Sequence, residues 1–116
     1  MPPKRNDVDQ HLPLKPVDFL VLMTLARGDR HGYGIVTDIA EQTDGRIRLV
    51  PGNLYTVLQR LENCGLLGPT PLRAAPDLKD QRRRYFAISP LGRKVLCAEA
   101  ERLRSLVDVA ESMDLI

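Results

Sequence analysis

Residues 51–66, PGNLYTVLQRLENCGL, restrict the fold more than any other segment, because both ends and both faces of one helix can be defined there. Pro51 and Gly52 break the preceding chain and open the helix, and Gly65 ends it. At about 100° of rotation per residue, its apolar side chains share an arc roughly 120° wide. They are Leu54, Val57, Leu58, Leu61 and Cys64. The segment therefore predicts a helix with one face buried in a core.

The opposite face of this helix carries hydrogen-bonding side chains and one large aromatic ring. Its residues are Tyr55, Thr56, Gln59 and Asn63, with Arg60 on one flank and Glu62 on the other. An ordinary solvated face would be richer in Lys and Glu, so this composition suggests a surface that contacts a partner. One helix alone does not identify that partner.

Two further helices are predicted before this segment. From Val17 to Ala26 nearly every residue is apolar, which predicts a helix buried on most sides, with Pro16 in its first turn, Asp18 at its positive end and Gly28 after its last turn. A second apolar stripe recurs at helical spacing and stops at Gly45. This stripe consists of Ile35, Val36, Ile39 and Ala40.

The remaining patterns predict β-structure around the helix at 51–64. RIRLV, residues 46–50, alternates with a period of two and predicts one short strand. Residues 66–72 and 83–89 predict a β-hairpin with a long, proline-bearing tip. The order is then helix, helix, strand, helix, hairpin, helix. A mainly α chain with a small β-hairpin in this order is a winged helix, a helix-turn-helix variant in which the hairpin flanks the recognition helix.

The last helix begins after Ser89, which is the expected N-cap. Apolar residues recur along it every seven positions and form a seam of about two heptads, Leu96, Leu103, Leu106, Ala110 and Met113. Such a seam can join two subunits; packing on its own domain is the alternative. We therefore divide the chain into an N-terminal arm at 1–14 that is flexible at least in part, a winged-helix domain at 15–89 and a dimerisation helix at 90–116.

The net charge of +2 conceals an uneven distribution along the chain. Residues 45–94 carry ten Lys or Arg against three Asp or Glu, a balance of +7. Residues 1–44 and 95–116 have balances of −2 and −3. A basic segment between two acidic ones is typical of a surface that binds a polyanion. For any single arginine in it, solvation of the surface stays the alternative.

Patterns that indicate enzymes, metal sites or membranes are missing from the sequence. Four side chains could ligate a soft metal, His11, His31, Cys64 and Cys97, and they lie far apart without a ligand spacing or catalytic motif. We therefore expect no enzyme activity, no metal and no cofactor. No apolar run is long enough to span a membrane, and residues 1–16 have no signal core. These observations predict a cytoplasmic protein with reduced, partly buried thiols.

Binding to duplex DNA accounts for the basic segment and the polar helix face together. A recognition helix touches bases or phosphates near its start, where Asn53, Tyr55, Thr56 and Gln59 lie, with Arg60 beside them. The predicted wing supplies cations for phosphates, and Arg46 and Arg48 can assist. The wing cations are Lys79, Arg82, Arg83 and Arg84. For the arginine triplet, a solvated strand edge that resists aggregation is the alternative.

Three segments in this order resemble the PadR family of winged-helix transcriptional regulators. They are HGYGI at 31–35, PGNLYTVLQRLENCGLL at 51–67 and RRRYFAISPLGRKVL at 82–96, and the resemblance spans about residues 12–110. It implies a bacterial homodimer that represses transcription from a pseudo-palindromic operator, often of an adjacent operon, and that often releases DNA on binding a small effector. The single C-terminal helix resembles the compact subgroup of the family.

The resemblance also assigns individual residues. His31, Gly32 and Tyr33 match the family's entry to the second helix; Gly52, Leu54 and Tyr55 match the start of its recognition helix; Arg83, Arg84 and Tyr85 match its wing. We therefore also expect His31, Tyr33 and Gly52 among the DNA-binding residues. Asn53 departs from the family, which usually has Thr at this position. Asparagine keeps a side chain that can cap a helix, and its amide is expected to alter the contacts with bases or phosphates.

The sequence does not identify a small-molecule effector, and it leaves one alternative to DNA as the partner. The chain has no Trp and five aromatics, so we do not expect a drug pocket built from stacked aromatics, whereas an apolar pocket between subunits stays open. The principal alternative function is a winged-helix module that binds an acidic protein partner.

Overall fold

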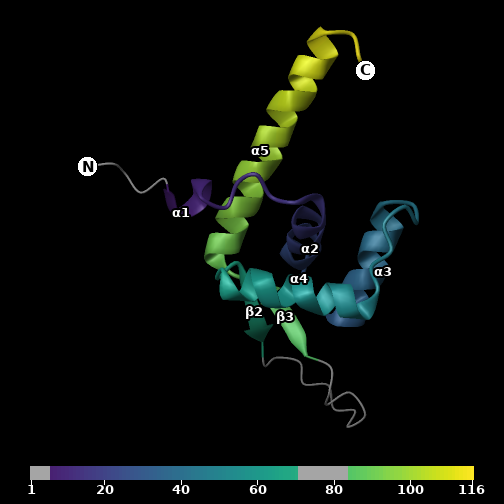
Figure 1. Cartoon of the computed structure of the whole chain (residues 1–116), viewed down its shortest axis with the longest axis vertical. Coiled ribbons are helices and arrows are strands. Elements are labelled where there is room, and N and C mark those ends of the chain that lie inside the picture. Colours follow the sequence, from purple (N-terminus) through teal and green to yellow (C-terminus); the bar gives the residue numbers. More distant parts are fainter. Residues whose placement is uncertain (1–5, 71–83) are drawn as a thin grey trace.

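Helices account for most of the residues that the structure, a computed structural model, describes: 6–70 and 84–116 (Figure 1). In chain order the elements are α1 (Asn6–Asp9), α2 (Pro16–Ala26), β1 (Arg30–His31), α3 (Gly32–Gln42), α4 (Pro51–Asn63), β2 (Leu67–Thr70), β3 (Tyr85–Ile88) and α5 (Pro90–Ser112). The predicted mainly helical chain with a small hairpin is confirmed. Among the described residues, no helix is long and apolar enough to cross a bilayer.

The three strands form an antiparallel sheet in the order β1-β3-β2. Within the hairpin, Leu67 is opposite Ile88 and Thr70 is opposite Tyr85, as expected for segments 66–72 and 83–89. On the other edge of β3, His31 of β1 is opposite Tyr85. The sheet therefore joins the base of the wing to the residue that precedes α3.

The short strand predicted at 46–50 is wrong. These residues lie in a connection between α3 and α4, and the first strand is instead at 30–31. Ile47 and Leu49 are half-buried against the core, whereas Arg46 and Arg48 are exposed. The period-two alternation thus reflects the burial of an extended connection, in which the Ile47 N–H bonds to the Thr43 hydroxyl at 3.1 Å instead of to a strand.

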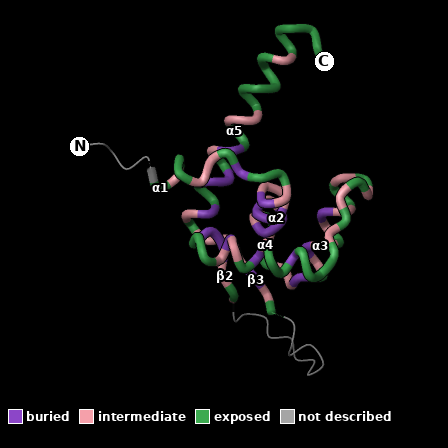
Figure 2. Tube along the Cα trace, viewed as in Figure 1, coloured by how far each residue is buried: buried purple, intermediate pink, exposed green. Residues whose placement is uncertain are grey.

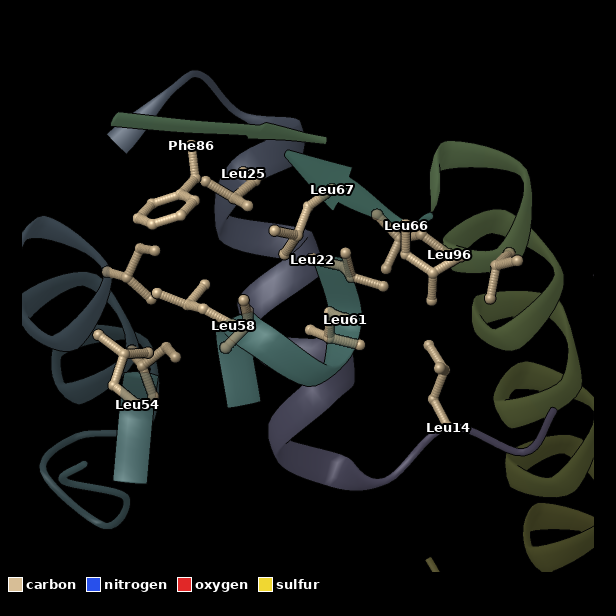
Figure 3. Close-up of a cluster of buried hydrophobic side chains, with 14 residues drawn as sticks. Leu14, Leu22, Leu25, Leu54, Leu58, Leu61, Leu66, Leu67, Phe86 and Leu96 are labelled. Atoms are coloured by element: carbon tan, nitrogen blue, oxygen red, sulfur yellow. The ribbon is translucent and has the colours of Figure 1, made fainter. Parts of the chain in front are cut away.

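The hydrophobic core consists mainly of residues from α2, α3, α4, the wing strands and the first half of α5. Figure 2 shows that the buried positions gather where these elements meet. Figure 3 shows Leu54, Leu58 and Leu61 pointing from α4 toward the core, which confirms the predicted apolar arc. Cys64 departs from it, because it is the C-cap of α4 and is exposed. Cys97 on α5 is exposed as well, so the expected partial burial of both thiols is wrong.

The first half of α5 packs on the domain, and its second half extends away from it (Figure 1). Ser89 caps the helix as predicted, accepting a hydrogen bond from the Gly92 N–H at 2.9 Å. Leu96 lies on the packed half and belongs to the core, with 8% of its surface exposed. Its assignment to an intersubunit seam is therefore wrong, because its side chain is covered by the core of its own domain, beside Leu66 (Figure 3).

The described part of the N-terminal segment, residues 6–14, packs against the rest of the domain, whereas residues 1–5 of the predicted arm lie outside the described residues. The short helix α1 lies against α5, and Leu14 is buried in the core. The Leu14 backbone N–H also interacts with the buried carboxylate of Glu99 on α5 and lowers the pKa of that carboxyl. An apolar residue and a backbone donor thus fix this segment despite its polar composition.

Candidate nucleic-acid interface

The outward face of α4 is the centre of the candidate site. Its polar residues, Gly52, Asn53, Tyr55, Thr56 and Gln59, are all exposed. The Tyr55 side chain is 57% exposed although it is large and partly apolar. Thr56 donates to the Gly52 carbonyl at 3.2 Å, and Gln59 donates to the Asn63 side chain at 3.2 Å, so both side chains lie along the helix surface. The arrangement presents hydrogen-bonding groups over successive turns of one helix.

Asn53 does not cap α4. The N-cap is Val50, without a side-chain hydrogen bond, and Pro51 occupies the first turn. Asn53 lies inside the helix and exposes its amide at the rim of a depression of about 520 Å³ between α4 and the start of α2. The inference of a capping role is wrong, because Pro51 shifts the helix start upstream.

Arg60 differs from the other predicted contacts because its guanidinium is bound to a buried carboxylate of the same chain. It donates two hydrogen bonds to the Asp18 carboxylate, at 2.7 and 2.9 Å, from α4 to the first turn of α2. These bonds raise the pKa of Arg60, and burial opposes them. Arg60 thus joins two helices, and its availability to a ligand is reduced.

His31 and Tyr33 lie at the start of α3. The Gly34 N–H donates to His31 Nδ1 at 3.1 Å, which makes His31 the N-cap of the helix. Tyr33 is exposed beside it, with the two rings nearly parallel. The structure therefore places Tyr33 at the surface and gives His31 an internal role.

The wing contributes one described cation, Arg84, which is exposed at the start of β3. Its guanidinium carbon lies 5.5 Å from the centre of the Phe86 ring. Lys79, Arg82 and Arg83 fall outside the described residues. In Figure 1 the wing strands lie beside α4, and α4 contacts β2, so the base of the wing and this helix are neighbours.

A second open depression, of about 490 Å³, follows the outward face of α4 itself. Its lining consists of Tyr55, Thr56, Gln59, Arg60, Asn63 and Cys64. Across residues 6–70 and 84–116, no three His, Cys, Asp or Glu side chains are grouped so that they could hold a metal ion. Because the depression is open and follows α4 from Tyr55 to Cys64, this surface is suited to contacts with an extended partner.

Sequence reasoning missed two ion pairs in which the carboxylate is buried. Asp18 and Arg60 are 42 positions apart, and no local pattern connects them. Glu99 and Arg102 on α5 are three positions apart, a spacing that indicates a helical pair, although not that Glu99 is buried.

Comparisons with known proteins place this architecture in a family. A model of the transcriptional regulator PadR-like family matches residues 21–98. Over 87 residues the chain is 41% identical to an uncharacterised 37.1 kDa protein of transposon TN4556 from Streptomyces fradiae. That match covers 75% of this chain but 23% of the transposon protein, so the chain spans about a quarter of that relative.

Solved structures confirm the winged helix-turn-helix fold. A transcriptional regulator from Clostridium thermocellum gives a TM-score of 0.67 at 24% identity, covering 96% of this chain and 97% of that one. A PadR family transcription regulator from Clostridium difficile gives 0.64 at 22% identity, with coverages of 85% and 98%. Because the family model matches more than half of its residues, the chain belongs to the PadR-like family of transcriptional regulators.

Proposed function

We propose that the chain is a homodimeric, sequence-specific DNA-binding repressor. Two copies of α4 would enter successive major grooves of a pseudo-palindromic operator, with half-sites about one helical turn apart. Release of the operator on binding of a small molecule completes the proposal. The observation that carries it is the exposed polar face of α4 above the buried Leu54, Leu58 and Leu61.

The side chains on α4 and the wing suit different parts of duplex DNA. Gln59 and Asn53 have amides that can pair bidentately with adenine in the major groove. Tyr55 and Thr56 offer hydroxyl groups to phosphate oxygens. Arg84, at the wing, supplies a positive charge that is independent of base sequence.

Dimerisation is supported by the second half of α5. Leu106, Val107 and Val109 expose half or more of their surface on this part of the helix, and Met113, Leu115 and Ile116 do so at its C-cap and just beyond it. Isolated exposed apolar residues are common, whereas a run of this kind along one projecting helix is typical of an interface. Leu103 and Ala110 are half-buried beside this run and complete the proposed contact.

Titration of the protein with fluorescent duplexes at two salt concentrations tests the proposal. We expect the DNA upstream of its own gene to bind more tightly than a random duplex, with affinity falling steeply as salt rises. Gln59→Ala should reduce the preference for the specific duplex by about 1–3 kcal/mol. Arg84→Ala should weaken both duplexes equally and reduce the salt slope by about one.

The matched control is Arg104→Ala, which removes the same charge from an exposed position on the projecting half of α5. It should leave the salt slope unchanged. Absence of binding to either duplex at low salt would reject the DNA-binding function and favour a module that binds an acidic protein partner.

A further inference from the structure

We propose that His31 is a positioning residue whose neutral imidazole holds together the start of α3, the wing base and α4, so that its protonation weakens DNA binding. The structural half of this inference stands on the fold alone, and the effect on DNA rests on the proposed function. The two halves are tested by separate measurements.

The first support is the hydrogen bond that caps α3. His31 has an extended backbone, and its Nδ1 accepts the Gly34 N–H at 3.1 Å. An accepting Nδ1 must carry a lone pair, so the bonded imidazole is neutral. Protonation would place a hydrogen on Nδ1, facing the Gly34 N–H, and would add positive charge at the positive end of the helix. The acid form of His31 therefore loses the cap.

The second support is the packing of the imidazole between two aromatic rings. The Tyr33 ring on α3 lies nearly parallel to it, with centroids 6.4 Å apart. The Tyr85 ring on β3 meets it edge-on at 5.3 Å, and His31 is opposite Tyr85 in the sheet. His31 is the N-cap of α3, and Tyr85 is the first residue of the wing strand β3. The imidazole therefore connects α3 directly to the wing.

The same corner touches the outward face of α4 through Gly32. A Cβ placed on Gly32 would lie 3.4 Å from Leu54 Cδ2 and 3.6 Å from the Tyr55 hydroxyl oxygen. The residue next to His31 is thus packed against both the buried and the outward face of α4. A shift of the start of α3 would move Tyr55, which we place at the DNA surface.

Other charged and titratable groups surround this corner. On β1 and α3, Arg30 and Asp38 pair at 3.5 Å, and the Arg30 side chain lies beside Gly34. Arg84 stands at the start of β3, and three phenols face the corner from α3, α4 and β3, Tyr33, Tyr55 and Tyr85. Arg30 adds to the cost of a second positive charge at His31, and the carboxylate of its partner Asp38 offsets part of that cost. Histidine is the side chain whose ordinary pKa places its change of charge between pH 5 and 8, and the chain has only two, His11 and His31.

The direction of the pH dependence separates a positioning role from direct contact with DNA. If His31 touched phosphate, protonation would add a cation to the interface, and acid would strengthen binding. If His31 holds the corner as a neutral cap, acid weakens binding. The two roles therefore predict opposite slopes between pH 8 and 5.5.

The decisive variant is His31→Asn, because asparagine is a strong N-cap that does not titrate. His11→Asn is the matched control, since it removes the other histidine. Nitrogen-15 NMR of the histidine rings should show an unprotonated Nδ1 for His31 at pH 7.5. Urea titrations measure the ratio of folded to unfolded protein. Between pH 8 and 5.5, loss of the His31 cap should lower this ratio about fivefold, which is the effect of removing a typical N-cap. The fall should persist in His11→Asn and disappear in His31→Asn.

Anisotropy titrations with duplex DNA over the same pH range test the second half. We expect the affinity for DNA to fall in acid for the wild type and for His11→Asn. For His31→Asn, the affinity should not change with pH. A protonated Nδ1 at pH 7.5, or an unchanged pH dependence of stability in His31→Asn, would overturn the cap. Tighter binding in acid that His31→Asn removes would identify a phosphate contact instead. If no variant binds DNA at any pH, the proposed function fails, while the NMR and urea results still decide the role of the cap.

Discussion

Asp18 and Arg60 join the first turn of α2 to α4 through two hydrogen bonds, at 2.7 and 2.9 Å. Asp18 is 4% exposed, whereas the Arg60 side chain is 39% exposed. The carboxylate is therefore the buried partner, and Arg60 is the group that compensates its charge. The pair fixes the helix that carries the proposed DNA contacts relative to the core helix.

Removing Arg60 should destabilise the protein more than removing both partners. Arg60→Met leaves a buried carboxylate without its cation, which should lower the free energy of unfolding by about 2–4 kcal/mol. The double variant Asp18→Asn/Arg60→Met should recover part of this loss, because no charge stays buried. Urea denaturation measures both, with Arg104→Met as an exposed control expected within about 0.5 kcal/mol of the wild type. The single variant Asp18→Asn completes the cycle, and strict additivity of the two single changes in the double variant would show that the side chains do not interact.

Glu99 should control part of the acid sensitivity of the fold. Hydrogen bonds from Arg102, at 2.7 and 2.8 Å, lower the pKa of Glu99 below its ordinary value of 4.5; the Leu14 N–H acts in the same direction, and burial opposes them. The folded chain thus takes up this proton less readily than the unfolded chain. The stabilisation is complete above pH 4.5 and is lost as the pH falls through the lower, folded pKa.

Glu99→Gln should therefore lower stability at pH 7 and flatten its decline below about pH 4.5. Glu101→Gln, an exposed change two positions away on the same helix, should alter neither. Thermal melts between pH 7 and pH 3 distinguish the two variants. An acid limb in Glu99→Gln as steep as that of the wild type would assign the sensitivity to other carboxylates.

Gly92 and Gly52 should respond oppositely to the addition of a methyl group. A Cβ on Gly92 would overlap the Leu66 backbone carbonyl, so α5 can approach the sheet only with glycine there. Nothing lies within 4 Å of a Cβ on Gly52. We expect Gly92→Ala to cost about 1–3 kcal/mol or more, and Gly52→Ala to raise stability by about 0.5–1 kcal/mol. Urea denaturation of the two variants compares these effects.

Gly52→Ala also tests the approach of DNA to the start of α4. Glycine in a helix is less stable than alanine, and the described contacts give no internal reason for it at this position. Close approach of a phosphate backbone supplies one. Gly52→Ala should then bind duplex DNA more weakly despite its greater stability. Equal affinity of the variant and the wild type would place DNA farther from this turn.

Local periodicity was sufficient for much of the fold. The arc of Leu54, Leu58 and Leu61 is buried because a regular helix places these residues on one side, whatever the rest of the chain does. The Ser89 cap and the hairpin are also local, since each depends on residues near in sequence. Predictions of this kind need no knowledge of tertiary contacts.

Tertiary contacts explain what the sequence did not show. Ile47 and Leu49 alternate with exposed residues, and this alternation gives the sequence pattern of a strand, although no strand forms at 46–50. In the sequence, Arg60 resembles a surface residue that is free to contact a partner. Its ion pair with Asp18 of α2 forms only in the folded chain. Leu96 fits the heptad spacing, yet it is buried in the core of the domain, whereas Leu106 on the same seam is 53% exposed.

The two ends of the α5 seam should behave differently when a charge is introduced. Leu106 is 53% exposed on the projecting half, so Leu106→Asp should separate the dimer without unfolding the domain. Leu96→Asp should unfold it, because a carboxylate would enter the core. Ser105→Asp adds the same charge at an exposed position next to the seam and should leave a stable dimer. Sedimentation gives the mass of each variant and urea denaturation its stability. A monomeric wild type, or a Leu106→Asp variant that still dimerises, would remove this half of α5 from the subunit contact.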